Sequence, residues 1–358
     1  MIKALHIVKA LGLGGTEKVI QLMATGLNRG KFIPVALSLE NGERAPLLRK
    51  SGIDTYIEGD LFNDILKIKP DIIHIHRGGW PEPELLRPAI QARRKLEAES
   101  GRTVPIVETN VFGRHDPSAH ARQLDCTLFV SRFCAERFAA QTGIQLESPR
   151  WQVLYNPIDY ETIVKNTVSP EKRDYSRPFA GRVSRADPGK WSRLGVAWLP
   201  EVCSRKPEFK YKIIGGIQSA EDFVHEHRLE KQVDFLPPFI YDLDLAAFFN
   251  EISVFCHAND TGESFGLVIA EAMAAGLPVI THPAEGLRDN AQMELVEHGK
   301  TGFVVNDAEE YAQAVLWLLD NPGEARRMGL AGREKAGKEY AQAVIAKKLE
   351  KIYLTLLE

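Results

Sequence analysis

Two glutamates in the segment 259–279 have the spacing and surroundings of ligand-binding acids. Glu263 lies in a polar, glycine-containing loop, and Glu271 follows eight residues later in an alanine-rich stretch that predicts a helix ending at Gly276 and Pro278. At a rise of about 1.5 Å per residue these carboxylates stand roughly 10 Å apart, so they cannot form an acid–base pair. They suit hydroxyl groups at the two ends of one polar ligand. In the alternative, Glu263 only caps the helix and Glu271 is a solvated helix residue.

Backbone amides at two strand-to-helix turns are placed to bind an anion. The loop 12–16, Gly-Leu-Gly-Gly-Thr, precedes an expected helix, and residues 265–267 open the helix that contains Glu271. Free N–H groups and the positive end of a helix dipole favour a phosphate at such turns. Glu17 stands where a dinucleotide-binding loop has its third glycine, and its carboxylate disfavours a pyrophosphate lying flat there. For the loop 12–16, a tight turn without a ligand is the alternative.

The elements that must position these groups alternate between strands and helices along the chain. This α/β alternation predicts two Rossmann-like domains with parallel sheets, over residues 1–165 and 166–338, that bind ligands beyond the carboxyl ends of their strands. The polar segment 159–177 is the expected linker, and an apolar stripe in residues 339–358 predicts a helix that packs back toward the N-terminal domain. The expected strands are 4–8, 34–38, 71–75, 104–107, 127–130, 151–154, 179–183, 211–214, 233–236, 253–256, 278–280 and 303–305.

Composition excludes several classes of protein. A chain of 358 residues with 44% hydrophobic and 26% charged residues is typical of a globular protein of two domains. A net charge of −3 gives no reason to expect nucleic acid as a partner. The four scattered cysteines indicate core thiols in a reducing compartment. No apolar run reaches the ~18 residues of a spanning helix, so we expect a cytoplasmic protein, with peripheral contact at the inner membrane face left open.

The segment around the two glutamates resembles the E-x7-E signature of family 4 retaining glycosyltransferases, which have the GT-B fold of two Rossmann-like domains facing across a cleft. The resemblance extends over nearly the whole chain, because further motifs follow in the order of that family. The motifs are Gly14-Gly15, His74-Ile-His76, Val130-Ser131, Tyr155-Asn-Pro-Ile-Asp159, Gly181-Arg182, Lys190, Glu263-Ser-Phe-Gly-Leu267, Glu271-Ala-Met-Ala-Ala-Gly-Leu-Pro-Val-Ile280 and Gly299-Lys-Thr-Gly-Phe303.

The resemblance implies a sugar-nucleotide site in the C-terminal domain. Arg182 and Lys190 would bind the donor diphosphate, and these cations with a helix N-terminus would stabilise the leaving group without a metal. Glu271 would bind the ribose hydroxyls and Glu263 a hydroxyl of the donor sugar, so Arg182, Lys190 and Glu263 are the expected catalytic groups. Further donor contacts are implied for Gly14, Gly15, Pro238, Ser264, Phe265, Gly266 and Leu267.

Two departures from the family pattern affect the sugar site. Many relatives have a histidine at the end of the strand that here leads into 108–113, where this sequence has Asn110 and Val111. Either Asn110 supplies that hydrogen bond or the donor sugar differs. The segment 283–287 replaces a Gly-Gly-x-x-Glu pattern, so the family's donor-sugar contacts do not carry over to that loop.

Three basic residues near these motifs have alternative roles. Arg185 is close enough to substitute for the expected cations, because the stretch 183–189 is longer than the family's usual spacing. His74 and His76 share one strand face, but without a third ligand at a suitable spacing we expect no metal. His76 is instead expected near the acceptor or the diphosphate.

The sequence therefore predicts a retaining glycosyltransferase that needs neither metal nor cofactor. It would move a hexose from a UDP-sugar such as UDP-glucose to a hydroxyl acceptor, lipid-linked or an oligosaccharide, in polysaccharide or glycoconjugate synthesis. Two alternatives are a sugar-nucleotide epimerase of GT-B fold, for which acid and base motifs are missing, and a catalytically silent homologue that binds a sugar nucleotide.

Overall fold

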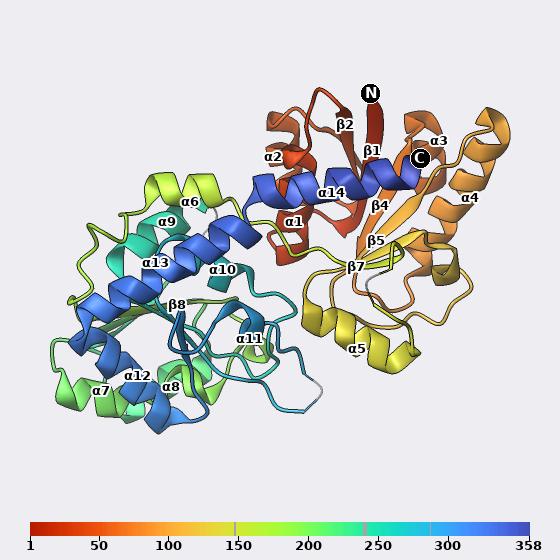
Figure 1. Cartoon of the computed structure of the whole chain (residues 1–358). Coiled ribbons are helices and arrows are strands. Elements are labelled where there is room, and N and C mark those ends of the chain that lie inside the picture. The colour runs from red at the N-terminus through yellow and green to blue at the C-terminus, as the bar shows by residue number, and fades with distance from the viewer. Residues whose placement is uncertain (147, 239–241, 287) are drawn as a thin grey trace. The chain divides into compact units, whose positions relative to one another are not determined.

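The chain forms two units, each built around its own parallel sheet (Figure 1). The computed structural model describes residues 1–146, 148–238, 242–286 and 288–358. Unit 1 comprises Met1–Ile158 and Gln342–Glu358, and unit 2 comprises Asp159–Ala341. The two Rossmann-like domains expected from the alternation of strands and helices are thus confirmed.

Unit 1 contains a seven-stranded sheet in the order β3-β2-β1-β4-β5-β6-β7, with every described neighbouring pair parallel. All six residues of β4 are buried, as expected for a central strand covered on both faces. The strands are β1 (Ile2–Ala10), β2 (Phe32–Glu40), β3 (Asp54–Ile57), β4 (Ile72–Arg77), β5 (Ile106–Asn110), β6 (Cys126–Phe129) and β7 (Trp151–Val153).

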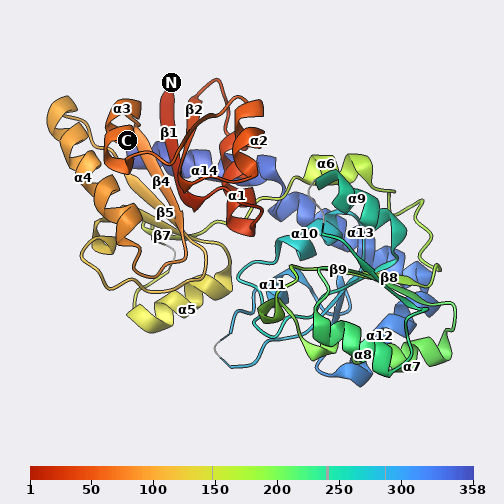
Figure 2. The same cartoon turned by 180° about the vertical axis from the view of Figure 1, so that it is seen from behind.

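Helices cover both faces of the unit 1 sheet, and the last helix of the chain is one of them (Figures 1 and 2). Helix α14 packs against α1, where Gln342 donates to the carbonyl of Leu22, and Tyr353 is fully buried. The return of the tail helix to the N-terminal domain is therefore observed. The helices are α1 (Gly15–Gly26), α2 (Arg44–Lys50), α3 (Leu61–Ile68), α4 (Pro83–Ser100), α5 (Arg132–Thr142) and α14 (Gln342–Leu357), with the 3-10 turn η1 (Ala121–Gln123).

Unit 2 contains a six-stranded parallel sheet in the order β10-β9-β8-β11-β12-β13. Its core includes Trp198, which stacks on Tyr311 at a ring separation of 5.3 Å. The strands are β8 (Phe179–Val183), β9 (Lys210–Ile214), β10 (Val233–Leu236), β11 (Val254–Cys256), β12 (Val279–Thr281) and β13 (Gly302–Val304). The helices are α6 (Tyr160–Asn166), α7 (Leu199–Arg205), α8 (Gln218–Glu226), α9 (Asp242–Glu251), α10 (Leu267–Ala274), α11 (Gln292–Leu295), α12 (Ala308–Asp320) and α13 (Pro322–Glu339), with the 3-10 turns η2 (Pro188–Lys190) and η3 (Arg193–Gly195).

The expected linker over 159–177 is wrong, because this segment is a packed part of unit 2. Helix α6 contacts α9 and α10. The buried guanidinium of Arg173 donates to the carbonyls of Ile252 and Ala275, each at 3.0 Å. Tyr175 is also buried and donates to the carbonyl of Gly276. The polar residues that suggested a linker therefore satisfy backbone carbonyls inside the unit, which is why the unit begins at Asp159.

Two further structural findings concern the cysteines and the apolar character of the helices. The four cysteines are free and buried, as expected of core thiols. No helix in the described ranges combines the length and the apolar character needed to cross a bilayer.

Candidate functional site

Glu263 is the centre of a polar cluster at the carboxyl ends of β8, β11 and β12 in unit 2. Its Oε1 accepts hydrogen bonds from Asn259 Nδ2 at 2.8 Å and from His257 Nε2 at 3.3 Å. Its Oε2 lies 3.5 Å from the Nζ of Lys190, and 20% of the side chain is exposed. One carboxylate oxygen of Glu263 is thus hydrogen-bonded, and the other is paired with a cation.

These partners decide the charge of Glu263. Burial alone would raise the pKa of its carboxyl group, but the hydrogen bond from His257 and the charge of Lys190 oppose burial and lower the pKa to about 2. Burial lowers the pKa of His257, so this histidine is neutral. Its Nε2 must carry the proton to donate to a carboxylate, and Nδ1 then accepts from the hydroxyl of Thr281 at 2.9 Å. Glu263 is consequently an ionised hydrogen-bond acceptor at neutral pH.

Buried amide and imidazole groups hold the loop that precedes α10. His282 accepts a hydrogen bond from the backbone N–H of Asn259 at 3.0 Å. The fully buried Gln292 accepts from the backbone N–H of Glu263 at 2.9 Å and donates to the carbonyl of His282 at 3.1 Å. Gly262 has a φ of +66°, where a side chain would be strained. The position of Glu263 is therefore fixed by its surroundings before any ligand arrives.

Lys190 lies in η2 and contacts Glu263, and Arg182 on β8 contacts the backbone of Lys190. The guanidinium of Arg182 donates to the carbonyl of Lys190 at 2.9 Å and lies over the ring of Trp191 at 4.2 Å. Arg182 is only 2% exposed, and burial lowers its pKa while the charge of Glu263 acts in the opposite direction. Thr261 donates to the carbonyl of Gly189 at 2.9 Å, which ties the two loops together.

Helix α10 places Glu271 in the interior of unit 2. The helix begins at Leu267, two residues later than expected, because Gly266 caps it with a φ of +100°. Glu271 is 3% exposed, so it is not the solvated helix residue of the alternative interpretation. Phe265 is buried and packs edge-on against Tyr340, while Ser264 and Leu267 are half-buried.

Three other residues expected to contact the donor belong to other elements of the chain. Gly14 and Gly15 form the start of α1 in unit 1, where the carboxylate of Glu17 folds back over Gly14 and leaves no room for a Cβ. Pro238 is exposed and follows β10, and the adjoining residues 239–241 lie outside the described residues. Arg185, the alternative cation, is exposed on the loop before η2.

Asn110 and His76 both lie in the interior of unit 1. Asn110 is 1% exposed, its Nδ2 donates to the carbonyl of Arg114 at 2.9 Å, and its Oδ1 accepts from the N–H of the same residue. Both ends of the amide are thus used within the turn 110–114. His76 is also 1% exposed, and its Nε2 is 3.1 Å from the Nδ1 of His6. Neither residue enters the function proposed below.

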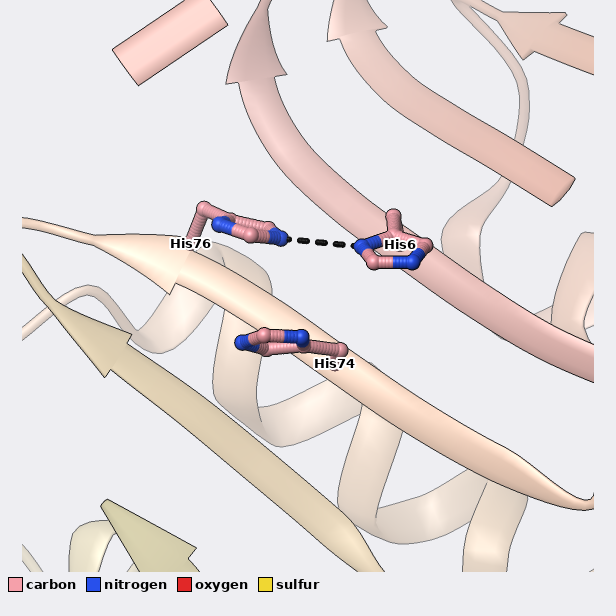
Figure 3. A group of neighbouring side chains, drawn as sticks. All are labelled: His6, His74 and His76. Atoms are coloured by element: carbon pink, nitrogen blue, oxygen red, sulfur yellow. Dashed lines mark hydrogen bonds between the residues drawn. The ribbon is translucent and has the colours of Figure 1, made fainter. Parts of the chain in front are cut away.

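The expectation that His74 and His76 have no third histidine nearby is wrong. The register of β1 and β4 pairs His6 with His74, so the three rings lie together (Figure 3). One nitrogen of each ring lies within 4.8 Å of the other two, which is close enough for a metal by distance alone. The ring planes are inclined by 21° to 38° to one another, and the ring of His76 stacks on those of His6 and His74.

Hydrogen bonds give this histidine cluster a structural role. His74 Nδ1 is 2.6 Å from the hydroxyl of Tyr353 on α14, and its Nε2 is 2.8 Å from the hydroxyl of Thr109 on β5. Both ring nitrogens of His74 are therefore already engaged. The cluster fits a hydrogen-bonded connection between the sheet and the C-terminal helix, and the expected lack of a metal stays a prediction.

Sequence reasoning missed His257, Gln292 and Trp191 as parts of the site. His257 directly follows the expected strand 253–256, so the rule that ligands gather at strand ends gave a signal for it. Gln292 had no local signal, because its contacts depend on a turn that brings α11 back to Glu263. In the sequence, Trp191 is typical of a core residue. Only the structure shows that the guanidinium of Arg182 lies over its ring.

Comparisons with known proteins agree with this architecture. Residues 169–335, which include the whole Glu263 cluster, match the family model for glycosyl transferases group 1. Trehalose synthase of Pyrococcus horikoshii is 28% identical over 200 residues, covering 53% of this chain but only 45% of that protein. Phosphatidyl-myo-inositol mannosyltransferase of Mycobacterium leprae is 26% identical over 308 residues, covering 80% of this chain and 74% of its own length.

A solved structure extends the likeness in fold over the full chain. Anabaena HepE, solved with UDP and glucose, superposes with a TM-score of 0.77 at 18% identity, and the match covers 99% of this chain and 100% of that one. The GT-B fold is thereby confirmed. Residues 169–335 are thus similar in sequence to glycosyl transferases group 1, and the fold of the chain is similar to that of HepE.

Proposed function

We propose that this protein is a retaining glycosyltransferase that moves a hexose from a UDP-sugar, such as UDP-glucose, to a hydroxyl acceptor. The observation that carries the proposal is the pair of Lys190 and Glu263, 3.5 Å apart and backed by Arg182, at the carboxyl edge of the unit 2 sheet. The solved complex of HepE with UDP and glucose supports this donor class. The mannosyltransferase relative makes mannose the second sugar to test, and its name supports a lipid-linked acceptor.

The proposed role of the cations follows from the charge that develops during transfer. When the glycosidic bond breaks, its electron pair stays on the diphosphate oxygen, so the leaving group gains negative charge. Lys190 and the amides at the start of α10 would stabilise that charge, because a fixed cation and a helix N-terminus both favour an anion. Arg182 would position Lys190 through its hydrogen bond to the Lys190 carbonyl.

Donor binding would exchange one ion pair for another. In the structure Lys190 faces Glu263, and an arriving diphosphate would compete for the same ammonium group. The hydrogen bonds from His257 and Asn259 would still favour the ionised form of Glu263, which would then accept a hydrogen bond from a hydroxyl of the donor sugar. This assigns Glu263 to sugar orientation and not to proton donation.

The proposed role of Glu271 is to bind the nucleoside. Its carboxyl group is buried on α10 and can accept hydrogen bonds from both ribose hydroxyls. Glu263 and Glu271 would therefore contact opposite ends of one donor molecule.

Retention of configuration would follow from attack on the face that the leaving group vacates. The acceptor oxygen forms the new bond to the anomeric carbon, the bond to the diphosphate oxygen breaks, and the acceptor proton passes to the departing diphosphate. No side-chain nucleophile is needed for this route, and the proposal includes neither a metal nor a cofactor.

Incubation of the purified protein with UDP-glucose, UDP-galactose and GDP-mannose tests the proposal. Slow release of nucleoside diphosphate without an acceptor, unchanged after treatment with EDTA, is the expected result. Accumulation of an isomerised sugar nucleotide would instead identify the epimerase. Tight binding with no turnover, even when glycolipid and oligosaccharide acceptors are offered, would identify the silent homologue.

A further inference from the structure

Unit 2 contains a groove that the proposed sugar-nucleotide site does not use. It has a volume of about 620 Å³ and is lined by residues of α12, the start of α13, and β13 with its flanking residues (Figure 1). This volume lies within the range of about 300–1,000 Å³ that is typical of small-molecule sites. None of the described lining residues belongs to the Glu263 cluster. A function of this groove is therefore separable from the donor chemistry.

An exposed tryptophan forms one wall of the groove. Trp317 on α12 is 39% exposed, and its ring packs edge-on against Phe303 at a centroid separation of 5.3 Å. The ring of His298 also packs edge-on against Phe303, at 5.5 Å. The buried side chains of Ala314 and Met328 complete the apolar part of the lining. Phe303 thus orients the indole of Trp317, and an oriented, exposed ring favours an occupant that can lie against it.

Oriented polar side chains line another part of the groove. The carboxylate of Glu310 accepts hydrogen bonds from the backbone N–H of Asn306 at 2.8 Å and from its Nδ2 at 3.0 Å. Arg327 donates through Nε to Glu324 at 2.8 Å and through Nη2 to the carbonyl of Gly299 at 2.9 Å. The side chains of these acids, the amide and the guanidinium are exposed and have further lone pairs or N–H groups for an occupant. The groove therefore offers hydrogen-bond donors and acceptors beside an aromatic ring.

The charges in the groove disfavour an anion. Glu324 is paired with Arg327, whereas no cation among the described lining residues pairs with Glu310. A wholly apolar occupant is also disfavoured, because it would bury exposed carboxylate and amide groups without replacing their hydrogen bonds to water. An uncharged polar ligand with one apolar face is complementary to both parts of the lining.

We propose that this groove binds a neutral oligosaccharide, with one hexose ring lying on Trp317. A hexose in its chair form presents C–H groups on one face and hydroxyl groups around its edge. The C–H face covers the indole, and the hydroxyl groups form hydrogen bonds with Glu310, Gln313 and Asn306. In a glycosyltransferase, such a site would hold a saccharide chain outside the donor site. That use rests on the function proposed above, whereas the binding itself does not.

Titration calorimetry of the full chain with neutral hexasaccharides of glucose, galactose and mannose tests the proposal. We expect at least one of them to bind, and Trp317→Ala to weaken its affinity about tenfold, as for the loss of a stacked aromatic ring. Trp317→Phe keeps a ring at this position and should stay within about threefold of the wild type. Gln313→Ala should weaken the affinity about threefold, as for the loss of one neutral hydrogen bond.

Two matched variants control for general surface effects within unit 2. Leu330→Ala removes an apolar side chain that is also 39% exposed but lies outside the groove lining. Gln218→Ala removes an exposed glutamine that, like Gln313, donates to an acid four residues away. Both variants should leave saccharide affinity within about twofold of the wild type.

Three outcomes would overturn the proposal. The first is that none of the hexasaccharides binds, and the second is that one binds but Trp317→Ala leaves its affinity unchanged, which would assign the saccharide to another site. The third is self-association in sedimentation velocity that Trp317→Ala abolishes, which would identify the groove as a contact between two copies of the chain. UDP affinity of all these variants should match the wild type, so failure here leaves the function proposed for the Glu263 cluster standing.

Discussion

At the scale of single residues, the site contains two carboxylates in different surroundings. Glu263 accepts hydrogen bonds from Asn259 and His257 and pairs with Lys190. These partners lower its pKa to about 2. Glu271 is buried on the helix that follows. The two glutamates look alike in the sequence, but their surroundings indicate two different roles. Single substitutions can separate these roles.

Isosteric substitutions should divide nucleoside binding from sugar chemistry. Glu271→Gln should weaken uridine and UDP alike, by roughly tenfold or more, because a hydrogen bond to a charged group contributes about 1.5–3 kcal/mol. Glu263→Gln should leave uridine affinity unchanged, keep or increase UDP affinity because Lys190 loses its competing partner, and lower turnover. Calorimetry with uridine and UDP, together with the rate of donor hydrolysis, measures these effects. Identical behaviour of the two variants would contradict the assigned roles.

At the scale of elements, the backbone turns that start the helices place the functional groups. Helix α10 begins at Gly266, whose φ of +100° belongs to the region that residues with a Cβ rarely adopt. A Cβ on Gly266 would also lie 3.3 Å from Ile269 and 3.5 Å from Glu263. The start of the helix and the position of Glu263 therefore depend on one glycine.

Gly266→Ala should destabilise this turn. The expected loss in the free energy of unfolding is about 1–2 kcal/mol, which is the cost of a left-handed conformation for a residue with a Cβ. Donor turnover should fall as well, because relief of the strained φ at residue 266 would change the turn that follows Glu263. Gly323→Ala is the matched control, because a Cβ there meets open space without a positive φ, and in helix α13 it should leave stability unchanged or raise it by up to about 1 kcal/mol. Urea denaturation followed by circular dichroism measures both variants, and equal stabilities would argue against the role of this turn.

Most elements of the fold could be predicted from alternating strand and helix patterns, but elements defined by distant contacts could not. Strand β3 escaped prediction because it is a short, half-exposed edge strand without a hydrophobic run. The segment with α6, Arg173 and Tyr175 resembled a linker because its polar groups find carbonyl partners that only the fold supplies. In the site, the family resemblance indicated Glu263, Lys190 and Arg182, while the contacts of Gln292 required the structure.

At the scale of the whole molecule, buried histidines link distant parts of unit 1. His6, His74 and His76 join β1 and β4 (Figure 3). The hydroxyl of Tyr353 contacts His74 and so connects this cluster to the last helix of the chain. Burial lowers the pKa of His6 to about 3 and lowers the pKa values of His74 and His76 well below 6.5. The His6 ring is therefore neutral in the folded protein at pH 5, whereas His6 of the unfolded chain binds a proton there.

The lowered pKa values of these histidines determine how the stability of the protein changes with pH. Unfolding takes up protons below pH 6.5, so stability is full above that pH and falls as pH is lowered toward the pKa values of the folded state. With a pKa of about 6.5 in the unfolded chain and about 3 in the folded protein, His6 costs about 2 kcal/mol of stability at pH 5. His76→Gln should lose less stability than the wild type between pH 7 and pH 5, because burial also lowers the pKa of His76.

The exposed residue His115 provides the control for this prediction within the same unit. His115→Gln should keep the wild-type pH dependence, and urea denaturation at the two pH values compares all three proteins. The carboxyl group of Glu263 titrates below this window, so it does not contribute. Parallel losses in the wild type and in His76→Gln would show that the cluster does not govern acid stability.

Titration calorimetry with UDP tests the central assignment of the cations most directly. Lys190→Ala removes the ammonium group 3.5 Å from Glu263, and Arg185→Ala removes an exposed cation from the same loop. The account predicts that Lys190→Ala weakens UDP affinity by roughly tenfold to 100-fold, as for a charged hydrogen bond, and that Arg185→Ala stays within about twofold of the wild type. Wild-type affinity in Lys190→Ala, or a larger loss in Arg185→Ala, would contradict it.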